Sequence, residues 1–177
     1  MGKTIILNLS GIKLTGDVLD VGESYGVIYN ISKDAIDEVS VDLLEGTIDE
    51  KNTYGEYDTC TVFFYLSSIW RESNKVNLIR EASKLVKVGG EIYIWDINKE
   101  VGEVSNNKVM AVLPSGKIKE FEFKNLNPIS KSNIDDTKRM LSDIYDIKEE
   151  KVWEDIFFVR GEKIKWLNER KKKWKYY

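Results

Sequence analysis

The residues that could do chemistry in this chain follow its first strongly buried-looking segment. Val18 to Val21 is apolar apart from Asp20, and two glycines, Gly22 and Gly26, come directly after it. A strand that runs into a glycine-bearing turn and then into a helix leaves backbone N–H groups and a helix N-terminus facing a crevice. Such crevices hold nucleotide-like ligands in α/β proteins. The pattern therefore predicts a ligand site around residues 20–26.

Asp42 is a second acidic candidate, because it ends the short β-branched run 39–41 and stands 22 residues after Asp20. That offset is close to the roughly 20 residues that separate the turn from the ribose-binding carboxylate in dinucleotide-binding folds. We favour ribose hydroxyl groups as the partner of Asp42. The alternative is a merged strand whose carboxylate approaches an adenine ring.

The chain has no histidine and a single cysteine. Without histidine, a general base would have to be Asp, Glu, Tyr or Lys. The sequence carries no metal-ligand grouping and no phosphate-binding P-loop, so we expect no metal site. Cys60 lies in the apolar run that ends at Leu66, which predicts a buried, unreactive thiol rather than a disulfide.

The elements that must position these residues alternate between strand and helix, which predicts an α/β fold with parallel strands and right-handed crossovers. A helix is expected over 75–87, with Ser73 or Asn74 as its N-cap and Gly89-Gly90 at its end. Asp96, at the end of the following strand, would point toward the crevice, or else cap a helix or face solvent. The other elements expected in the first hundred residues are an N-terminal flap at 5–7, strands at 18–21, 39–41, 60–66 and 92–95, a short helix at 25–33 and a loop at 45–56.

The last third of the chain changes character. The runs 109–113 and 118–123 flank Pro114-Ser115-Gly116-Lys117 and predict a β-hairpin. Apolar residues at helical spacing predict a helix over 133–145. Two further strands, 147–153 and 156–160, would close the body as an antiparallel pair.

Charge divides the chain into a body, 1–162, and a basic aromatic tail, 163–177. The segment 162–177 has seven Lys or Arg and two Glu, net +5, while the whole chain carries −3, so the other 161 residues carry −8. Aromatic and basic residues together could contact nucleic acid or an anionic surface weakly. A solvated final helix is the alternative. Because no apolar run is long enough for a leader or a membrane span, we expect a cytoplasmic protein.

Three segments together resemble the class I S-adenosylmethionine-dependent methyltransferases. Val18-Leu19-Asp20-Val21-Gly22 through Gly26 is similar to the family's first motif, Tyr57-Asp58 with 59–66 to its fourth strand, and Leu85-Val86-Lys87-Val88-Gly89-Gly90 to the turn before its fifth strand. The resemblance covers roughly 15–163. It implies a Rossmann-like methyltransferase sheet that is mostly parallel with an antiparallel C-terminal strand. Since 14 residues separate Asp42 from Tyr57, too few for the family's next helix and strand, the sheet should be reduced at one edge.

The resemblance implies S-adenosylmethionine as cofactor, a methyl acceptor of unknown identity as partner, and catalysis by alignment after the fourth strand, at Tyr65 and Ser67. The cofactor-binding residues that it implies are Asp20, Gly22, Glu23, Ser24, Tyr25, Gly26, Asp42, Tyr65 and Leu66. Ser24 departs from the family, which has glycine there, and Tyr25 adds bulk that could stack on adenine or take its place. A catalytically inactive, methyltransferase-like binding or regulatory module is therefore the alternative function.

Overall fold

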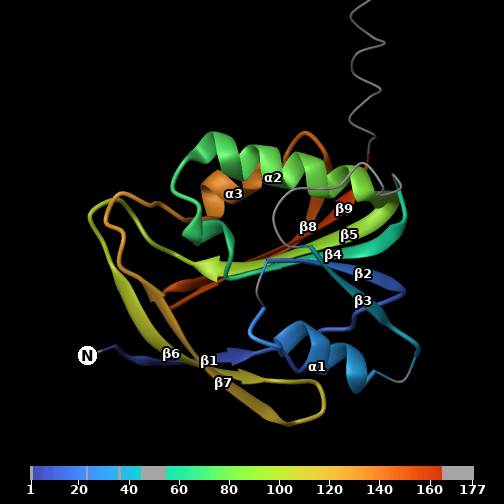
Figure 1. Ribbon diagram of the computed structural model, residues 1–177, viewed down its shortest axis with the longest axis horizontal. Helices are drawn as coiled ribbons and strands as arrows, with labels where there is room; N and C mark the ends of the chain where they lie inside the picture. The colour runs from blue at the N-terminus through green and yellow to red at the C-terminus, as the bar shows by residue number, and fades with distance from the viewer. Residues whose placement is uncertain (1, 23, 36, 45–54, 165–177) are drawn as a thin grey trace, which may run out of the picture.

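The computed structural model describes residues 2–22, 24–35, 37–44 and 55–164. These residues form three layers (Figure 1). A six-stranded sheet is the middle layer, helices α2 (Glu72–Leu85) and α3 (Ile134–Leu141) cover one face, and helix α1 (Val27–Lys33) with a three-stranded sheet covers the other.

The six-stranded sheet has the order β3-β2-β4-β5-β9-β8. Four strands run parallel, and the last two are antiparallel to their neighbours. The predicted α/β class and the mostly parallel sheet with an antiparallel C-terminal strand are thus confirmed, and β3 is the edge strand on the reduced side. The strands are β2 (Asp17–Val21), β3 (Ser40–Leu44), β4 (Tyr57–Phe63), β5 (Val86–Ile97), β8 (Tyr145–Trp153) and β9 (Ile156–Lys163).

A second sheet, which the sequence did not predict, has the order β1-β6-β7. The predicted hairpin is confirmed as β6 (Ser105–Val112) and β7 (Ile118–Asn125). The N-terminal run that was expected as a flap before the first central strand is β1 (Thr4–Asn8), which pairs in parallel with β6. Alternate residues of β1 are buried, so this strand has one face for the core and one for solvent.

Two apolar clusters hold the layers together, one on each face of the six-stranded sheet. The first lies between that sheet, the three-stranded sheet and α1, and includes Trp95 and Phe63. The second lies under α2 and α3 and includes Cys60, which is fully buried as predicted. Burial raises the pKa of its thiol, so Cys60 is a structural residue.

Several predicted boundaries differ from the structure. Helix α2 begins at Glu72 after Arg71 as N-cap and ends at Leu85, so Ser73 and Asn74 are helical rather than capping. Gly89 and Gly90 lie inside β5 and do not end the helix. A Cβ on Gly90 would lie 2.8 Å from the carbonyl oxygen of Asp58, so the glycine serves a close approach between β4 and β5.

Helix α3 is shorter than expected at its C-terminal end. Asn133, where the predicted helix starts, is its N-cap, and its side chain accepts a hydrogen bond of 2.8 Å from the Asp136 amide. The helix ends at Leu141, and Tyr145 already belongs to β8.

The loop predicted at 45–56 lies outside the described residues except for its last two.

Strand β9 includes Lys163, the first residue of the predicted tail. Lys163 is buried, and its Nζ donates 2.7 Å to the Val86 carbonyl oxygen. The rest of the predicted tail lies outside the described residues, apart from Ile164.

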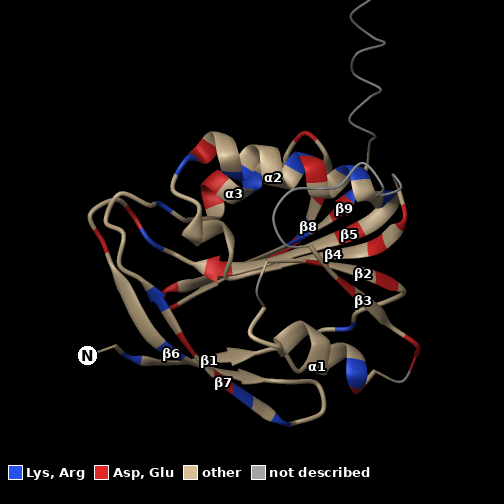
Figure 2. Ribbon diagram, in the orientation of Figure 1, with Lys and Arg blue, Asp and Glu red and all other residues tan. Residues whose placement is uncertain are grey.

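Within the described ranges no helix is long and apolar enough to cross a membrane. Figure 2 shows Lys and Arg interspersed with Asp and Glu along α2 and α3.

Candidate functional site

The β2–α1 turn, residues 22–26, lies where the chain topology opens the sheet. From β2 the chain moves to β3 on one side, and it returns in β4 on the other, so the carboxyl end of β2 is a topological switch point. The Gly22 amide donates 3.0 Å to the Leu44 carbonyl oxygen and ties the turn to β3. Gly22 and Gly26 both have positive φ, 80° and 73°, which favours glycine. Glu23 lies outside the described residues.

Asp20 supports this turn from inside. It is 3% exposed, and the Thr61 hydroxyl donates 2.8 Å to its Oδ1. Burial raises the pKa of Asp20 to about 6, although hydrogen bonds from Ser24 and Thr61 lower it. Ser24 therefore turns its hydroxyl group toward a buried carboxyl. The side chain that distinguishes Ser24 from the glycine of the family is itself buried.

Tyr65 covers the other side of the turn. A Cβ built on Gly22 would lie 2.3 Å from Cδ2 of the Tyr65 ring, so the ring packs directly on the Gly22 backbone. The chain reaches this position through Phe64, whose φ of 51° is unusual for a residue with a bulky side chain. A short 3-10 turn, η1 (Leu66–Ser68), follows Tyr65. Tyr65 thus occupies the space over Gly22 in which a ligand was expected.

Tyr25, the other aromatic residue of the turn, points elsewhere. Its ring stacks on Phe121 of β7 with centroids 4.4 Å apart and planes 14° apart. It therefore covers the three-stranded sheet and does not lie over Gly22. Leu66, which was also expected at the cofactor, is 1% exposed and packs in the cluster under α2.

Asp42 does not end its strand, because β3 continues to Leu44. In register Asp42 lies beside Leu19, and its Oδ2 accepts a 2.8 Å hydrogen bond from the Tyr57 hydroxyl. Tyr57 is the first residue of β4, so this pair is not at the carboxyl ends of the strands where the turn lies. The acidic residue that follows Leu44 in the chain is Glu45, which lies outside the described residues.

Ser67 and Asp96 meet beneath η1. The Ser67 amide donates 2.9 Å to Asp96 Oδ2, and the Ile97 amide donates 2.7 Å to Oδ1. Asp96 is fully buried, so its carboxylate faces neither solvent nor an open crevice. It caps η1 by accepting the hydrogen bond from the Ser67 amide. Burial raises the pKa of Asp96 to about 6, while the hydrogen bonds from Ser67 and Ile97 and the charge of Lys75 lower it.

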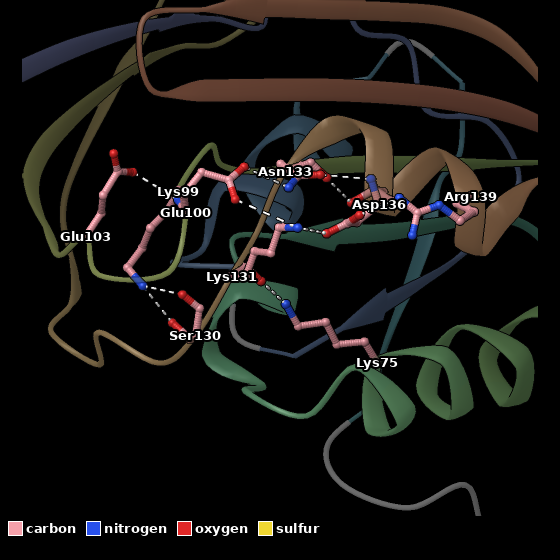
Figure 3. A network of polar contacts seen from close by, with 10 residues as sticks. Lys75, Lys99, Glu100, Glu103, Ser130, Lys131, Asn133, Asp136 and Arg139 are labelled. Carbon is pink, nitrogen blue, oxygen red and sulfur yellow. Dashed lines mark hydrogen bonds and ion pairs between the residues drawn. The ribbon is translucent and has the colours of Figure 1, made fainter.

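A polar network that the sequence did not predict fixes the segment between β7 and α3 (Figure 3). Lys99 is 2% exposed, and its Nζ donates 2.8 Å to the Asn127 carbonyl oxygen and also to Ser130. Lys75 of α2 donates to the Lys131 carbonyl oxygen, and the Lys131 ammonium lies 3.1 Å from the Asp136 carboxylate. Buried lysine ammonium groups bound to carbonyl oxygens leave no sequence signal, since isolated lysines look like surface residues.

A cavity of about 340 Å³ opens beside the turn, between η1 and the end of β7. Tyr25, Tyr65 and Ser67 all line it, so the structure brings these three predicted residues together. Asp20, Gly22 and Ser24 meet at the turn next to it. Asp42 and Leu66 do not join either group. No group of three or more metal-binding side chains occurs among the residues that the structure describes.

No family model matches the chain. No curated protein matches it in sequence either. Solved structures do match it: a S-adenosylmethionine-dependent methyltransferase from Clostridium acetobutylicum has a TM-score of 0.57 at 12% identity, over 86% of this chain and 85% of that one. A SAM-dependent methyltransferase from Methanosarcina mazei has a TM-score of 0.55 at 14% identity, over 84% and 92%.

A third similar structure is the 1,6-didemethyltoxoflavin-N1-methyltransferase of Burkholderia thailandensis, with bound 1,6-didemethyltoxoflavin and S-adenosylhomocysteine. Its TM-score is 0.57 at 9% identity, over 84% of this chain and 71% of that one. At these identities the likeness establishes the fold. The chain has the fold of the class I S-adenosylmethionine-dependent methyltransferases, as the sequence motifs predicted.

Proposed function

We propose that this protein binds S-adenosylmethionine at the carboxyl ends of β2 and β4 and transfers its methyl group to an acceptor. The observation that carries the proposal is the glycine turn at the switch point, with Gly22 and Gly26 in the left-handed region directly after β2. Ligands bind at this place in open α/β sheets. The matching methyltransferase structures support the same choice.

The residues of the turn fit the cofactor on one condition. Gly22 to Gly26 supply backbone without side chains at two positions, and Ser24 points its hydroxyl group inward. The Tyr65 ring, however, lies on Gly22 and has to turn aside before a nucleoside can take that place. Tyr65 also lines the 340 Å³ cavity.

The protein's own part in the reaction is alignment and exclusion of water, because bound S-adenosylmethionine supplies an activated methyl group. Asp20 keeps the turn in place through Thr61 and Ser24. Tyr65 and Ser67, on the cavity side, are the residues that we propose face the acceptor. The Asp96 carboxylate fixes the position of Ser67 by accepting a hydrogen bond from its amide.

A second candidate is a binding or regulatory module that has kept the methyltransferase fold without its activity. The Tyr65 ring on Gly22 favours this candidate, because it covers the backbone that a cofactor would need. Both candidates predict the same fold, so only ligand binding separates them.

Calorimetric titration with S-adenosylmethionine and S-adenosylhomocysteine tests the proposal. The wild type is expected to bind both, and Tyr65→Ala to bind about fivefold more tightly, because a ring that must move lowers the binding-competent fraction. Tyr65→Phe, which keeps the ring and loses the hydroxyl group, should bind like the wild type. Absence of binding by both the wild type and Tyr65→Ala at millimolar ligand would leave the inactive module.

Asp42→Asn is expected to leave S-adenosylmethionine affinity unchanged. Its carboxylate is engaged by Tyr57 in the middle of the sheet edge rather than at the carboxyl ends of the strands. The same titration measures this, with the folded state checked by circular dichroism. A marked loss of affinity in this variant would restore the ribose-binding role that the sequence spacing favoured.

A further inference from the structure

The 340 Å³ cavity beside the turn has walls from three separate parts of the chain. Tyr25 comes from the β2–α1 turn, Phe64 to Ser68 follow β4, and Phe123 to Asn127 form the end of β7 and the segment after it. Since Tyr65 belongs both to this cavity and to the covered face of Gly22, the cavity adjoins the proposed cofactor site. The cavity is therefore placed to hold the acceptor.

Four of the ten residues that line this cavity are aromatic. Phe64 and Phe123 lie with centroids 5.2 Å apart, and Tyr25 and Tyr65 complete the ring-bearing set. Among the described residues the lining has no Asp or Glu and one charged side chain, Lys124, whose ammonium lies 3.4 Å from the Glu122 carboxylate. Ring faces without an available charge favour a flat, uncharged ligand.

The amide side chains of the lining are already engaged within the protein. Asn125 donates 2.8 Å to the Ser67 carbonyl oxygen and accepts 3.1 Å from the Ser130 hydroxyl. Asn127 Oδ1 accepts 3.0 Å from the Ile129 amide. These hydrogen bonds fix the positions of both amide side chains in the cavity wall.

Ser67 differs from these amides. Its hydroxyl oxygen is buried and makes no hydrogen bond of ordinary geometry, although it lies close enough to the Asp96 carboxylate to lower the pKa of that group. A buried hydroxyl group without a well-formed hydrogen bond is costly unless something pairs with it. Ser67 is thus a buried side chain of the lining whose hydroxyl group is left to meet a polar group of the ligand.

We propose that this cavity binds the acceptor, and that the acceptor is a small, planar, uncharged aromatic compound with a hydroxyl or N–H group that pairs with Ser67. The identity of this ligand as an acceptor rests on the proposed function, whereas its binding does not. Asp96 acts as a positioning residue, because it holds the Ser67 amide and caps η1 from beneath.

Three probes of similar size test the ligand class in the absence of any cofactor. The first, 2-naphthol, is flat and uncharged, decahydro-2-naphthol has the same hydroxyl group without the aromatic faces, and 2-naphthoate carries a negative charge. Calorimetry is expected to show that 2-naphthol binds, and that each of the other two binds at least about tenfold more weakly. Equal affinity of 2-naphthol and either of the others would overturn the proposed class.

Ser67→Ala tests the polar anchor. The variant is expected to bind 2-naphthol about fivefold more weakly, because one hydrogen bond is lost. Ser32→Ala is the matched control, since Ser32 is also a buried serine but its hydroxyl group donates to Tyr29 of its own helix, outside the cavity. Wild-type affinity in a folded Ser67→Ala protein would remove Ser67 from the site.

The titrations separate this inference from the proposed function. S-adenosylmethionine binding without 2-naphthol binding contradicts the ligand class alone. Binding of 2-naphthol to a protein that ignores S-adenosylmethionine contradicts the methyltransferase and leaves an aromatic-binding module.

Discussion

Gly22→Ala is expected to destabilise the protein by about 3 kcal/mol, which combines left-handed backbone strain with overpacking. The φ of 80° is unfavourable for any residue with a Cβ. In addition, the new methyl group would lie 2.3 Å from Cδ2 of Tyr65, so the ring would have to leave its place. Urea unfolding of the wild type and the variant measures the difference.

A double-mutant cycle with Tyr65→Ala separates the two contributions. In the Tyr65→Ala background the ring is gone, so Gly22→Ala should carry the backbone strain alone, about 1–2 kcal/mol. Gly116→Ala provides the matched control, because Gly116 has a φ of 84° and open space where a Cβ would go. An equal effect of Gly22→Ala with and without the Tyr65 ring would show that the ring does not rest on the turn.

Between pH 4 and pH 8, the free energy of unfolding of Asp20→Asn is expected to rise by about 3 kcal/mol relative to that of the wild type. Each unit of pKa shift corresponds to about 1.4 kcal/mol. The pKa of Asp20 rises from 3.8 to about 6 on folding. Between these values the folded state holds a proton that the unfolded state has released, so this group makes the wild type less stable as the pH rises. Asparagine does not titrate, so the variant should gain stability relative to the wild type over this range.

Asp58→Asn is the control with the opposite sign. Hydrogen bonds from the Asp17 amide and Lys87 lower the pKa of Asp58, so its contribution is present above the unfolded pKa and is lost as the pH falls. Relative to the wild type, Asp58→Asn should therefore lose stability as the pH rises. Urea unfolding at a series of pH values measures both variants. If the free energy of unfolding of Asp20→Asn changed with pH as that of the wild type does across pH 4–8, Asp20 would not be buried as described.

The sequence predicted those parts of the fold that local pattern decides. The continuous apolar strands and the helix between β4 and β5 established the parallel sheet, and the glycines after Val21 established the turn. The predicted start of α3 at Asn133 coincides with the N-cap of that helix. In each case the relevant information lies within a few residues in the chain.

The features that the sequence did not predict depend on residues far apart. Asp42 was placed at a strand end because spacing alone cannot give register, and two further residues of β3 moved it away from the turn. The Tyr65 ring reaches Gly22 through a backbone conformation at Phe64 that no local pattern marks. Likewise, Lys99 looks like a surface residue in the sequence and is buried by contacts with distant segments.

The pairing of β1 with β6 has a consequence for the order in which the protein is made. Thr4 pairs with Lys108, and the cluster on that face of the six-stranded sheet also needs Phe121 and Phe123 of β7. A chain emerging from the ribosome therefore carries the apolar side chains of Ile5 and Leu7 uncovered until β6 and β7 have been synthesised. Long-range closure of this kind slows folding and exposes nascent chains to aggregation, so β1 has to wait about a hundred residues for the strand that it pairs with.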